Sequence, residues 1–256
     1  MKREETYSKL VLPVKAITWW HSIFKALVDV NAEVVNFTWD KHSLQCSHTF
    51  LQLGLLQIQL PHQDTEDYEI VGRLSGFIGV NVKAVFSIFK SLLKKQDLKI
   101  EFVSETSFGV YNEDVNATVK HMNLDVASLD PTELVDRWEF VVPSSSFRDA
   151  LPLFKALNIE TITFFKGLVE PLTIFSDEHA DSVVKTKIVA EVTKLCNKVH
   201  KSSYALKYID LMGHLCQLVE RFDLILSAGP IFFRFDLPGH GSIVVYLAPK
   251  ITEEEM

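Results

Sequence analysis

The chain has 256 residues, of which 47% are hydrophobic and 11% aromatic, a composition that excludes a disordered chain. Its formal net charge of -7 argues against a protein coated with basic residues for nucleic acid, so any basic surface must be local. Three widely spaced cysteines give no complete disulfide framework, and no leader-like or membrane-length apolar segment occurs. We therefore expect a soluble intracellular protein with no membrane partner.

The first predicted helix covers residues 15–30, where apolar residues recur at the i, i+3, i+4, i+7 spacing of one buried face. Asn81 is a suitable N-cap for a second helix, which follows it directly. In that second segment the apolar face is uninterrupted, and the opposite face carries a stripe of basic side chains: Lys83, Lys90 and Lys94. The pattern predicts a core-packed helix with a basic outer surface.

A short repeat divides the chain. Phe24-Lys25-Ala26-Leu27 recurs 130 positions later as Phe154-Lys155-Ala156-Leu157, and each copy follows a strand end that contains a proline. A duplicated half of about 128 residues would produce such a repeat. We therefore expect two similar domains, residues 1–122 and 138–256, joined by an acidic and irregular connecting loop at residues 123–137.

The second half is expected to repeat the two helices of the first. A third helix should open at Ser144 or Ser145, with a kink or a delayed start because Pro152 lacks the N–H of a helical residue. A fourth is predicted to begin near Ser202 or Ser203. Short apolar or alternating runs bounded by turns predict strands at residues 34–38, 50–60, 97–103, 108–111, 115–122, 139–142, 161–165, 172–175, 183–189, 224–226, 231–236 and 242–246. The expected fold class is α+β, with two helices packed on antiparallel sheets in each half.

Sequence signatures of catalysis are missing, because the chain has no nucleophile elbow, no Walker loop and no H-E-x-x-H motif. The only metal-like spacings are His42, Cys46 and His48 in the first half, and Cys196 with His200 in the second. Neither set completes the four ligands of a structural zinc site. We therefore expect neither an enzyme nor a metal or cofactor.

Four segments, spread in order along most of the chain, carry a family resemblance. The most specific is the ending Tyr246-Leu247-Ala248-Pro249-Lys250-Ile251, which three glutamates follow. The others are Gly79-Val80-Asn81-Val82, Met122-Asn123-Leu124-Asp125-Val126 with Leu129, and Tyr204-Ala205-Leu206-Lys207-Tyr208-Ile209. They resemble the chain end, the second helix start, the connecting loop and the last helix of proliferating cell nuclear antigen (PCNA), the DNA sliding clamp family, in a divergent form.

The resemblance implies two clamp domains per subunit and three subunits closed head to tail into a ring. Helices would line the hole, which would encircle duplex DNA without reading its sequence. Because duplex DNA is a dense line of phosphates, a lysine stripe without base-reading side chains suits this role. The residues expected to face DNA are Lys83, Lys90, Lys94, Lys207, His214, Lys155, Arg148 and Lys15. Trp19, Asp149 and Pro152 stand where the family is more basic, which predicts an inner surface less basic than usual.

The resemblance also implies a groove that binds clamp-interacting peptides. Its expected lining consists of apolar residues from the connecting loop and the chain end: Leu129, Pro131, Pro230, Tyr246, Ala248 and Pro249. Expected partners are a DNA polymerase, a clamp loader and other proteins that carry such peptides. Ring closure is expected through edge strands near residues 115–119 and 183–189.

The leading hypothesis is therefore a homotrimeric processivity factor for DNA replication and repair, located in the nucleus or in a viral replication compartment. Two alternatives keep the fold and change the assembly: a subunit of a heterotrimeric, checkpoint-type clamp, or a monomeric polymerase accessory factor. Another is an interaction scaffold that never touches DNA. The mass of the purified protein and its behaviour on DNA separate these possibilities.

Overall fold

The structure is a computed structural model that describes residues 8–14, 17–50, 54–61, 69–95, 97–122, 136–176, 183–237 and 241–250. Internal contacts divide the chain into two compact units. Unit 1 comprises Met1–Phe50, Leu56–Ser128 and Leu237–Ile243, and unit 2 comprises Leu51–Leu55, Leu129–Asp236 and Val244–Met256. Most of the expected connecting loop lies outside the described residues, so the domain boundaries stay a prediction.

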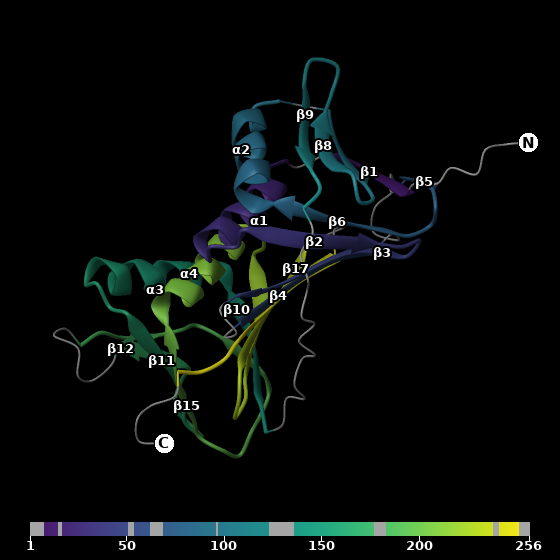
Figure 1. The fold of residues 1–256 in the computed structure, drawn as a ribbon. Helices are drawn as coiled ribbons and strands as arrows, with labels where there is room; N and C mark the ends of the chain where they lie inside the picture. The colour runs from purple at the N-terminus through teal and green to yellow at the C-terminus, as the bar shows by residue number, and fades with distance from the viewer. Residues whose placement is uncertain are drawn as a thin grey trace, which may run out of the picture. The chain divides into compact units, whose positions relative to one another are not determined.

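Unit 1 contains two helices and two groups of antiparallel strands (Figure 1). One group has the order β5-β1-β7-β8-β9 and consists of β1 (Ser8–Val14), β5 (Glu69–Gly72), β7 (Leu98–Val103), β8 (Ser107–Tyr111) and β9 (Asn116–Lys120). The other has the order β4-β3-β2-β6 and consists of β2 (Val34–Trp39), β3 (Ser43–Phe50), β4 (Gly54–Pro61) and β6 (Gly76–Asn81). The helices are α1 (Ile17–Asp29) and α2 (Val82–Leu92), which pack side by side.

Unit 2 repeats this plan. Its first group of strands has the order β14-β10-β16-β17-β18 and consists of β10 (Trp138–Pro143), β14 (Glu191–Lys194), β16 (Arg221–Leu226), β17 (Ile231–Leu237) and β18 (Gly241–Leu247). Most of each strand belongs to unit 2, and only the end of β17 and the start of β18 are counted with unit 1. Its second has the order β13-β12-β11-β15 and consists of β11 (Thr161–Lys166), β12 (Thr173–Ser176), β13 (Lys185–Lys187) and β15 (His200–Ala205). The helices are α3 (Ser144–Ala156) and α4 (Leu206–Leu215), which also contact each other.

The two units thus have the same sequence of elements and the same strand order in each group. The duplicated α+β architecture expected from the short repeat is confirmed in the described parts of the chain. The repeat itself falls at equivalent places, because Phe24 and Phe154 both lie in the first helix of their unit and are both fully buried.

Aromatic side chains fill the core of each unit between the helices and the strands. In unit 1, the ring of Phe24 lies 5.5 Å from that of Phe89 and 6.2 Å from that of Phe37. In unit 2, the ring of Phe147 lies 5.5 Å from that of Phe222 and 6.0 Å from that of Phe233. Burial of large apolar side chains is the dominant stabilising term in folding. Because the buried side chains of each helix face the core, their positions also determine which side chains are exposed on its opposite face.

Three local predictions were wrong. Ser202 and Ser203 do not open the fourth helix, because they pair with β11 inside β15, and α4 begins only at Leu206. Pro152 does not delay the third helix, which begins at Ser144 and continues past the exposed proline to Ala156, while the kink given as the alternative stays a prediction. The strand predicted at residues 50–60 is not one strand, because β3 ends at Phe50 and β4 begins at Gly54. None of the helices in the described ranges is long and apolar enough to cross a membrane.

Candidate functional site

The basic face of α2 follows directly from how this helix begins and packs. The side-chain oxygen of Asn81 accepts a hydrogen bond from the Ala84 N–H at 2.9 Å, which caps the helix as expected. Val85 and Phe89 are fully buried. Lys83 and Lys90 are therefore held on the exposed face, and Lys94 is exposed just after the helix end. These three lysines, with Ser87 and Ser91 between them, form what we call the α2 basic face.

The neighbouring helix α1 adds positive charge beside this face. His21 of α1 stacks on Phe86 of α2, with ring centroids 5.0 Å apart. Burial lowers the pKa of His21, and the charges of Lys25 and Lys90 lower it further. A cation from each helix therefore acts on the same imidazole. Lys25 also forms an ion pair of 2.8 Å with Asp29, one turn further along α1, which offsets part of its charge.

Lys25 is a residue that the sequence predictions missed. Its equivalent in the short repeat, Lys155, was included among the residues expected to face DNA. Applying the repeat in both directions would have identified Lys25 as well. Both lysines have an acidic partner, because Lys155 of α3 forms an ion pair with Asp210 of α4.

The helical face of unit 2 carries weaker positive charge. Arg148 is exposed on α3 next to the exposed Asp149, and the charge of Lys155 is offset by Asp210. Lys207 of α4 is exposed, and its Nζ lies 4.7 Å from the centroid of the Tyr208 ring. The remaining predicted residue, His214, is half-buried in the last turn of α4. The negative end of the helix dipole stabilises a positive charge at this position.

Two leucines interrupt the polar surface of α3. Leu153 is 50% exposed and Leu157, just after the helix, is 43% exposed. Pro152 and Ala156 lie beside them and are also exposed. Four of the predicted positions, Arg148, Lys155, Lys207 and His214, thus lie on the two helices of unit 2, together with these exposed apolar side chains.

A second candidate site lies near the chain end in unit 2. The ring of Tyr246 in β18 meets that of Phe232 in β17 edge to face, with centroids 4.8 Å apart. Both rings are half-buried, and burial raises the pKa of Tyr246. Pro230 precedes β17, and its carbonyl oxygen accepts a hydrogen bond from the Ser227 hydroxyl at 2.8 Å. The alternation of strand side chains places Phe232 and Tyr246 on one face, and Phe232 was missed by the sequence predictions.

The segment after β18 is anchored to the neighbouring group of strands. The Lys250 N–H donates to the Ser203 carbonyl oxygen at 2.7 Å, and Lys250 Nζ donates to the Thr161 hydroxyl at 2.7 Å. Ala248 is exposed and Pro249 is half-buried just before this anchor. The apolar surface formed by Pro230, Phe232, Tyr246, Ala248 and Pro249 is called the chain-end surface below.

Three residues of the predicted sites, Lys15, Leu129 and Pro131, lie outside the described residues. Within the described ranges, no group of three or more His, Cys, Asp or Glu side chains is arranged to hold a metal ion. Cys46 is buried, and burial raises the pKa of its thiol to about 12. A thiol with so high a pKa is a poor metal ligand and a poor nucleophile.

Comparison with known proteins gives a likeness in structure only. No family model matches the sequence, and no curated protein matches it. Among solved structures, PCNA of Entamoeba histolytica aligns over 96% of this chain and 99% of its own, with a TM-score of 0.77 and 16% identity. PCNA of Thermococcus kodakaraensis aligns over 95% of this chain and 100% of its own, with a TM-score of 0.77 and 15% identity.

A third similar structure is the PCNA2–PCNA3 complex of Sulfolobus tokodaii. One chain of that complex aligns over 94% of this chain and 99% of its own length, with a TM-score of 0.76 and 14% identity. All three likenesses span nearly the whole chain in both directions. The fold predicted from the short resemblances is therefore confirmed: this chain has the two-domain DNA clamp fold of PCNA.

Proposed function

We propose that the chain is a DNA sliding clamp, a non-catalytic processivity factor that encircles duplex DNA and tethers a DNA polymerase and other replication and repair proteins. The observation that carries the proposal is the likeness of nearly the whole chain to PCNA structures. The α2 basic face supports it, because exposed lysines on a rigid helix attract phosphates without reading bases. Its place of action is proposed to be the nucleus, or the replication compartment of a virus.

A test of this proposal measures retention on DNA. The purified protein, loaded by its clamp loader on a nicked circular plasmid, should stay bound until the plasmid is linearised, because a ring slides off a free end. Replacing Lys83 and Lys90 with glutamate should shorten retention on the circle and reduce polymerase processivity. The matched control replaces Lys41 and Arg73, which are exposed in unit 1 outside the helices, with glutamate. Equal processivity in both variants would reject the role of α2.

We propose closure of three identical subunits through β9 and β13. Within the described residues, each of these strands lies at the end of its group of strands, and one side of its backbone pairs with no other strand there. Val183 and Val189, which flank β13, are 71% and 69% exposed, as expected of residues that a neighbour covers. Light scattering of the pure protein should give about three times 29.1 kDa, and a stable monomer would reject self-closure.

A second assembly has one observation in its favour. Lys120 at the end of β9 and both Lys185 and Lys187 of β13 are exposed, so closure between identical chains brings lysines to the same interface. Like charges directly opposite each other destabilise strand pairs. A different chain with acidic edges would close the ring more favourably, which supports a subunit of a heteromeric clamp. If the pure protein is monomeric but forms a ring with a second clamp-like chain, this alternative replaces the homotrimer.

The chain-end surface is proposed to bind clamp-interacting peptides. An edge-to-face aromatic pair beside prolines provides an apolar anchor site of the kind on which short peptides depend. Replacing Tyr246 and Pro249 with alanine should weaken binding of a consensus clamp-interacting peptide by about 2 kcal/mol. Isothermal titration with the peptide measures this loss, and unchanged affinity would remove the chain-end surface from the site.

A further inference from the structure

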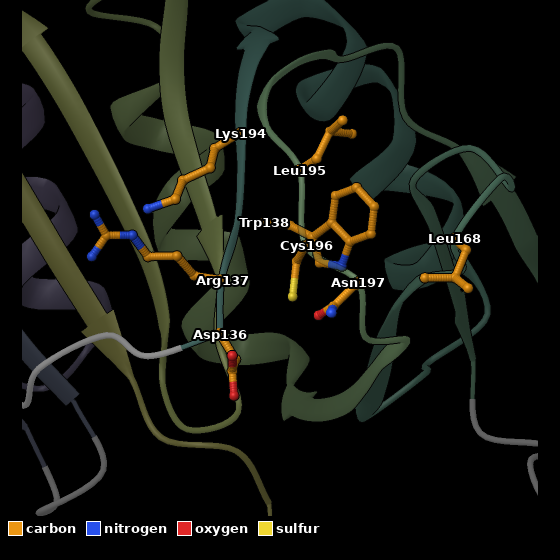
Figure 2. Close-up of a pocket in the computed structure, with 8 residues that line it drawn as sticks. All are labelled: Asp136, Arg137, Trp138, Leu168, Lys194, Leu195, Cys196 and Asn197. Atoms are coloured by element: carbon orange, nitrogen blue, oxygen red, sulfur yellow. The ribbon is translucent and has the colours of Figure 1, made fainter.

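A cavity of about 680 Å³ opens in unit 2 beside the edge strand β14. Its apolar lining includes Leu168, from the connection between β11 and β12, and Leu195, which directly follows β14. Figure 2 shows Trp138 between these two leucines. This volume lies within the range of pockets that bind ligands, so the cavity has room for apolar side chains of a bound molecule.

The leucines of this cavity are unusually open to solvent. Leu195 is 77% exposed and Leu168 is 55% exposed. Val169, which follows Leu168 in the sequence, and Val199, four residues after Leu195, are also exposed. Contiguous exposed apolar side chains with a polar rim mark interaction sites more often than isolated ones do.

The floor of the cavity is rigid, because two segments are attached to Trp138. Its indole N–H donates to the Lys198 carbonyl oxygen at 2.8 Å, which fixes the segment after β14. The buried ammonium of Lys166 lies 4.1 Å from the centroid of the Trp138 ring and donates to the Gly167 carbonyl oxygen at 2.6 Å, which fixes the turn that carries Leu168. A preformed site loses less conformational entropy when a ligand binds.

The edge of β14 is available for strand pairing. Within the described residues β14 pairs with β10 alone, and all four of its residues are exposed. The pairing shifts register between Glu139 and Phe140, so the strand is bulged where it leads into the cavity. Open sheet edges bind extended peptides by main-chain hydrogen bonds, while adjacent pockets select the side chains.

The charged rim of the cavity favours an acidic ligand. Three cations, Arg137, Lys194 and Lys198, share two carboxylates: Arg137 lies 2.6 Å and Lys194 3.5 Å from the same oxygen of Glu139, and Lys198 pairs with Asp136. These five groups, which lie on the β14 side of the rim, carry one positive charge in excess, whereas on the Leu168 side the Glu170 carboxylate accepts a hydrogen bond from the Val169 N–H at 3.3 Å. Figure 2 shows Arg137 and Lys194 extending on the side away from Leu168. A ligand that is apolar at one position and acidic beside it matches this arrangement.

We propose that this face of unit 2 is a second peptide-docking site, distinct from the chain-end surface. Its occupant is an extended segment of a partner protein that adds a strand to β14, inserts a branched apolar side chain between Leu168 and Leu195, and places an Asp or Glu against Lys194. The proposal rests on unit 2 alone and holds whether or not the chain encircles DNA.

The test begins with a phage-displayed library of random linear octapeptides, panned on the full chain carrying Tyr246→Ala and Pro249→Ala so that the chain-end surface does not compete. Enriched peptides should contain a branched apolar residue next to an acidic one. Their affinity, measured by fluorescence anisotropy, should fall about tenfold or more in Leu195→Glu and in Leu168→Glu. Both leucines are exposed, so these variants should fold. Leu74→Glu, an equally exposed leucine of unit 1, is the control and should bind normally.

Strand addition has its own signature. Two versions of an enriched peptide are made, one N-methylated at its odd-numbered residues and one at its even-numbered residues. Only one set of amides faces β14, so one version should bind and the other should not. Equal binding of the two methylated peptides, or enrichment of peptides that ignore Leu195→Glu, would overturn the proposal. It would also be overturned if no peptide is enriched, or if Leu195→Glu lowers the mass in light scattering without any captured peptide, because a second copy of the chain would then cover this face.

Discussion

The helical faces of the two units share one architecture and differ in charge. In unit 1, α2 has two lysines and no acidic residue, and Lys94 extends the stripe past the helix end. In unit 2, Lys155 forms an ion pair with Asp210 and Arg148 is next to Asp149 in the sequence, while Leu153 on α3 and Leu157 just after it are exposed. The number of basic residues on a surface is therefore a poor measure of its charge. The charge of each face depends on how many of its cations lack a nearby carboxylate. This number differs between the two units although their architecture is the same.

The largest expected effect on stability comes from a buried histidine of unit 2. His200 is buried in β15, and burial lowers its pKa from 6.5 to about 4. Between these pH values the imidazole is protonated in the unfolded chain but not in the folded chain, so the free energy of unfolding falls as the pH falls. The slope is about 1.4 kcal/mol per pH unit, or about 3 kcal/mol in total.

Urea unfolding at pH 7, 5.5 and 4.5, followed by circular dichroism, measures this slope. The His200→Gln variant should lose most of the pH dependence, because its amide does not titrate. The exposed His42, replaced in the same way, is the control and should leave the slope unchanged. An unaltered slope in His200→Gln would assign the pH dependence to other groups.

The next effect compares the two helical faces directly. Replacing Lys83 and Lys90 with glutamate should weaken binding to duplex DNA about tenfold or more, and replacing Arg148 and Lys207 should weaken it less. Each lost phosphate contact also lowers the slope of log affinity against log salt by about 0.9. Affinity measured over a salt series for both double variants tests the ranking. An equal loss for the two pairs would contradict the inferred difference between the units.

Helix caps give a smaller effect. Asn81 caps α2 with its side chain, whereas the positions before α3 and α4, Pro143 and Ala205, make no side-chain cap hydrogen bond. Asn81→Ala should destabilise the protein by about 1 kcal/mol, and Asn81→Ser should restore most of it. Chemical unfolding of the three proteins measures both changes. A neutral alanine variant would mean that packing of Val85 and Phe89 alone sets the start of α2.

The smallest expected effect concerns the ion pair between α3 and α4. Asp210→Asn removes the partner of Lys155, and both side chains are partly exposed, so stability should change by less than about 1 kcal/mol. Affinity for duplex DNA should rise a few-fold, because the freed lysine adds positive charge to the weaker face. The same titrations measure this change. Lower affinity in Asp210→Asn would show that the pair orients Lys155 for its ligand rather than occupying it.

The regular parts of the fold were predictable because local signals and tertiary structure agree there. Asn81 and the apolar spacing after it predict α2 correctly, since the cap and the buried face require the same start. The prediction failed at Ser202 and Ser203, which are good caps locally but pair with β11 in the folded chain. Strand pairing depends on residues distant in sequence, so no local pattern could have placed the start of α4.

The candidate sites were predictable in kind more than in detail. Lysine positions on α2 follow from helical spacing, but the partner of Lys155 lies on another helix and so could not be found from spacing. Phe232 was missed because its contact with Tyr246 depends on the pairing of two strands, which helical or strand spacing alone does not reveal. The cavity beside β14 combines residues from three separate segments, and only the fold brings Leu168 close to Leu195.

The position of Lys166 affects how its amine reacts. This lysine is 4% exposed and is held between the Trp138 ring and the Gly167 carbonyl group. Acylating reagents require an accessible, deprotonated amine, whereas Lys194 and Lys198 nearby have largely exposed side chains. Brief acetylation of the native protein should therefore modify those two lysines and spare Lys166. The rate at which Lys166 is acetylated over longer times should therefore measure how often the turn that carries Leu168 opens.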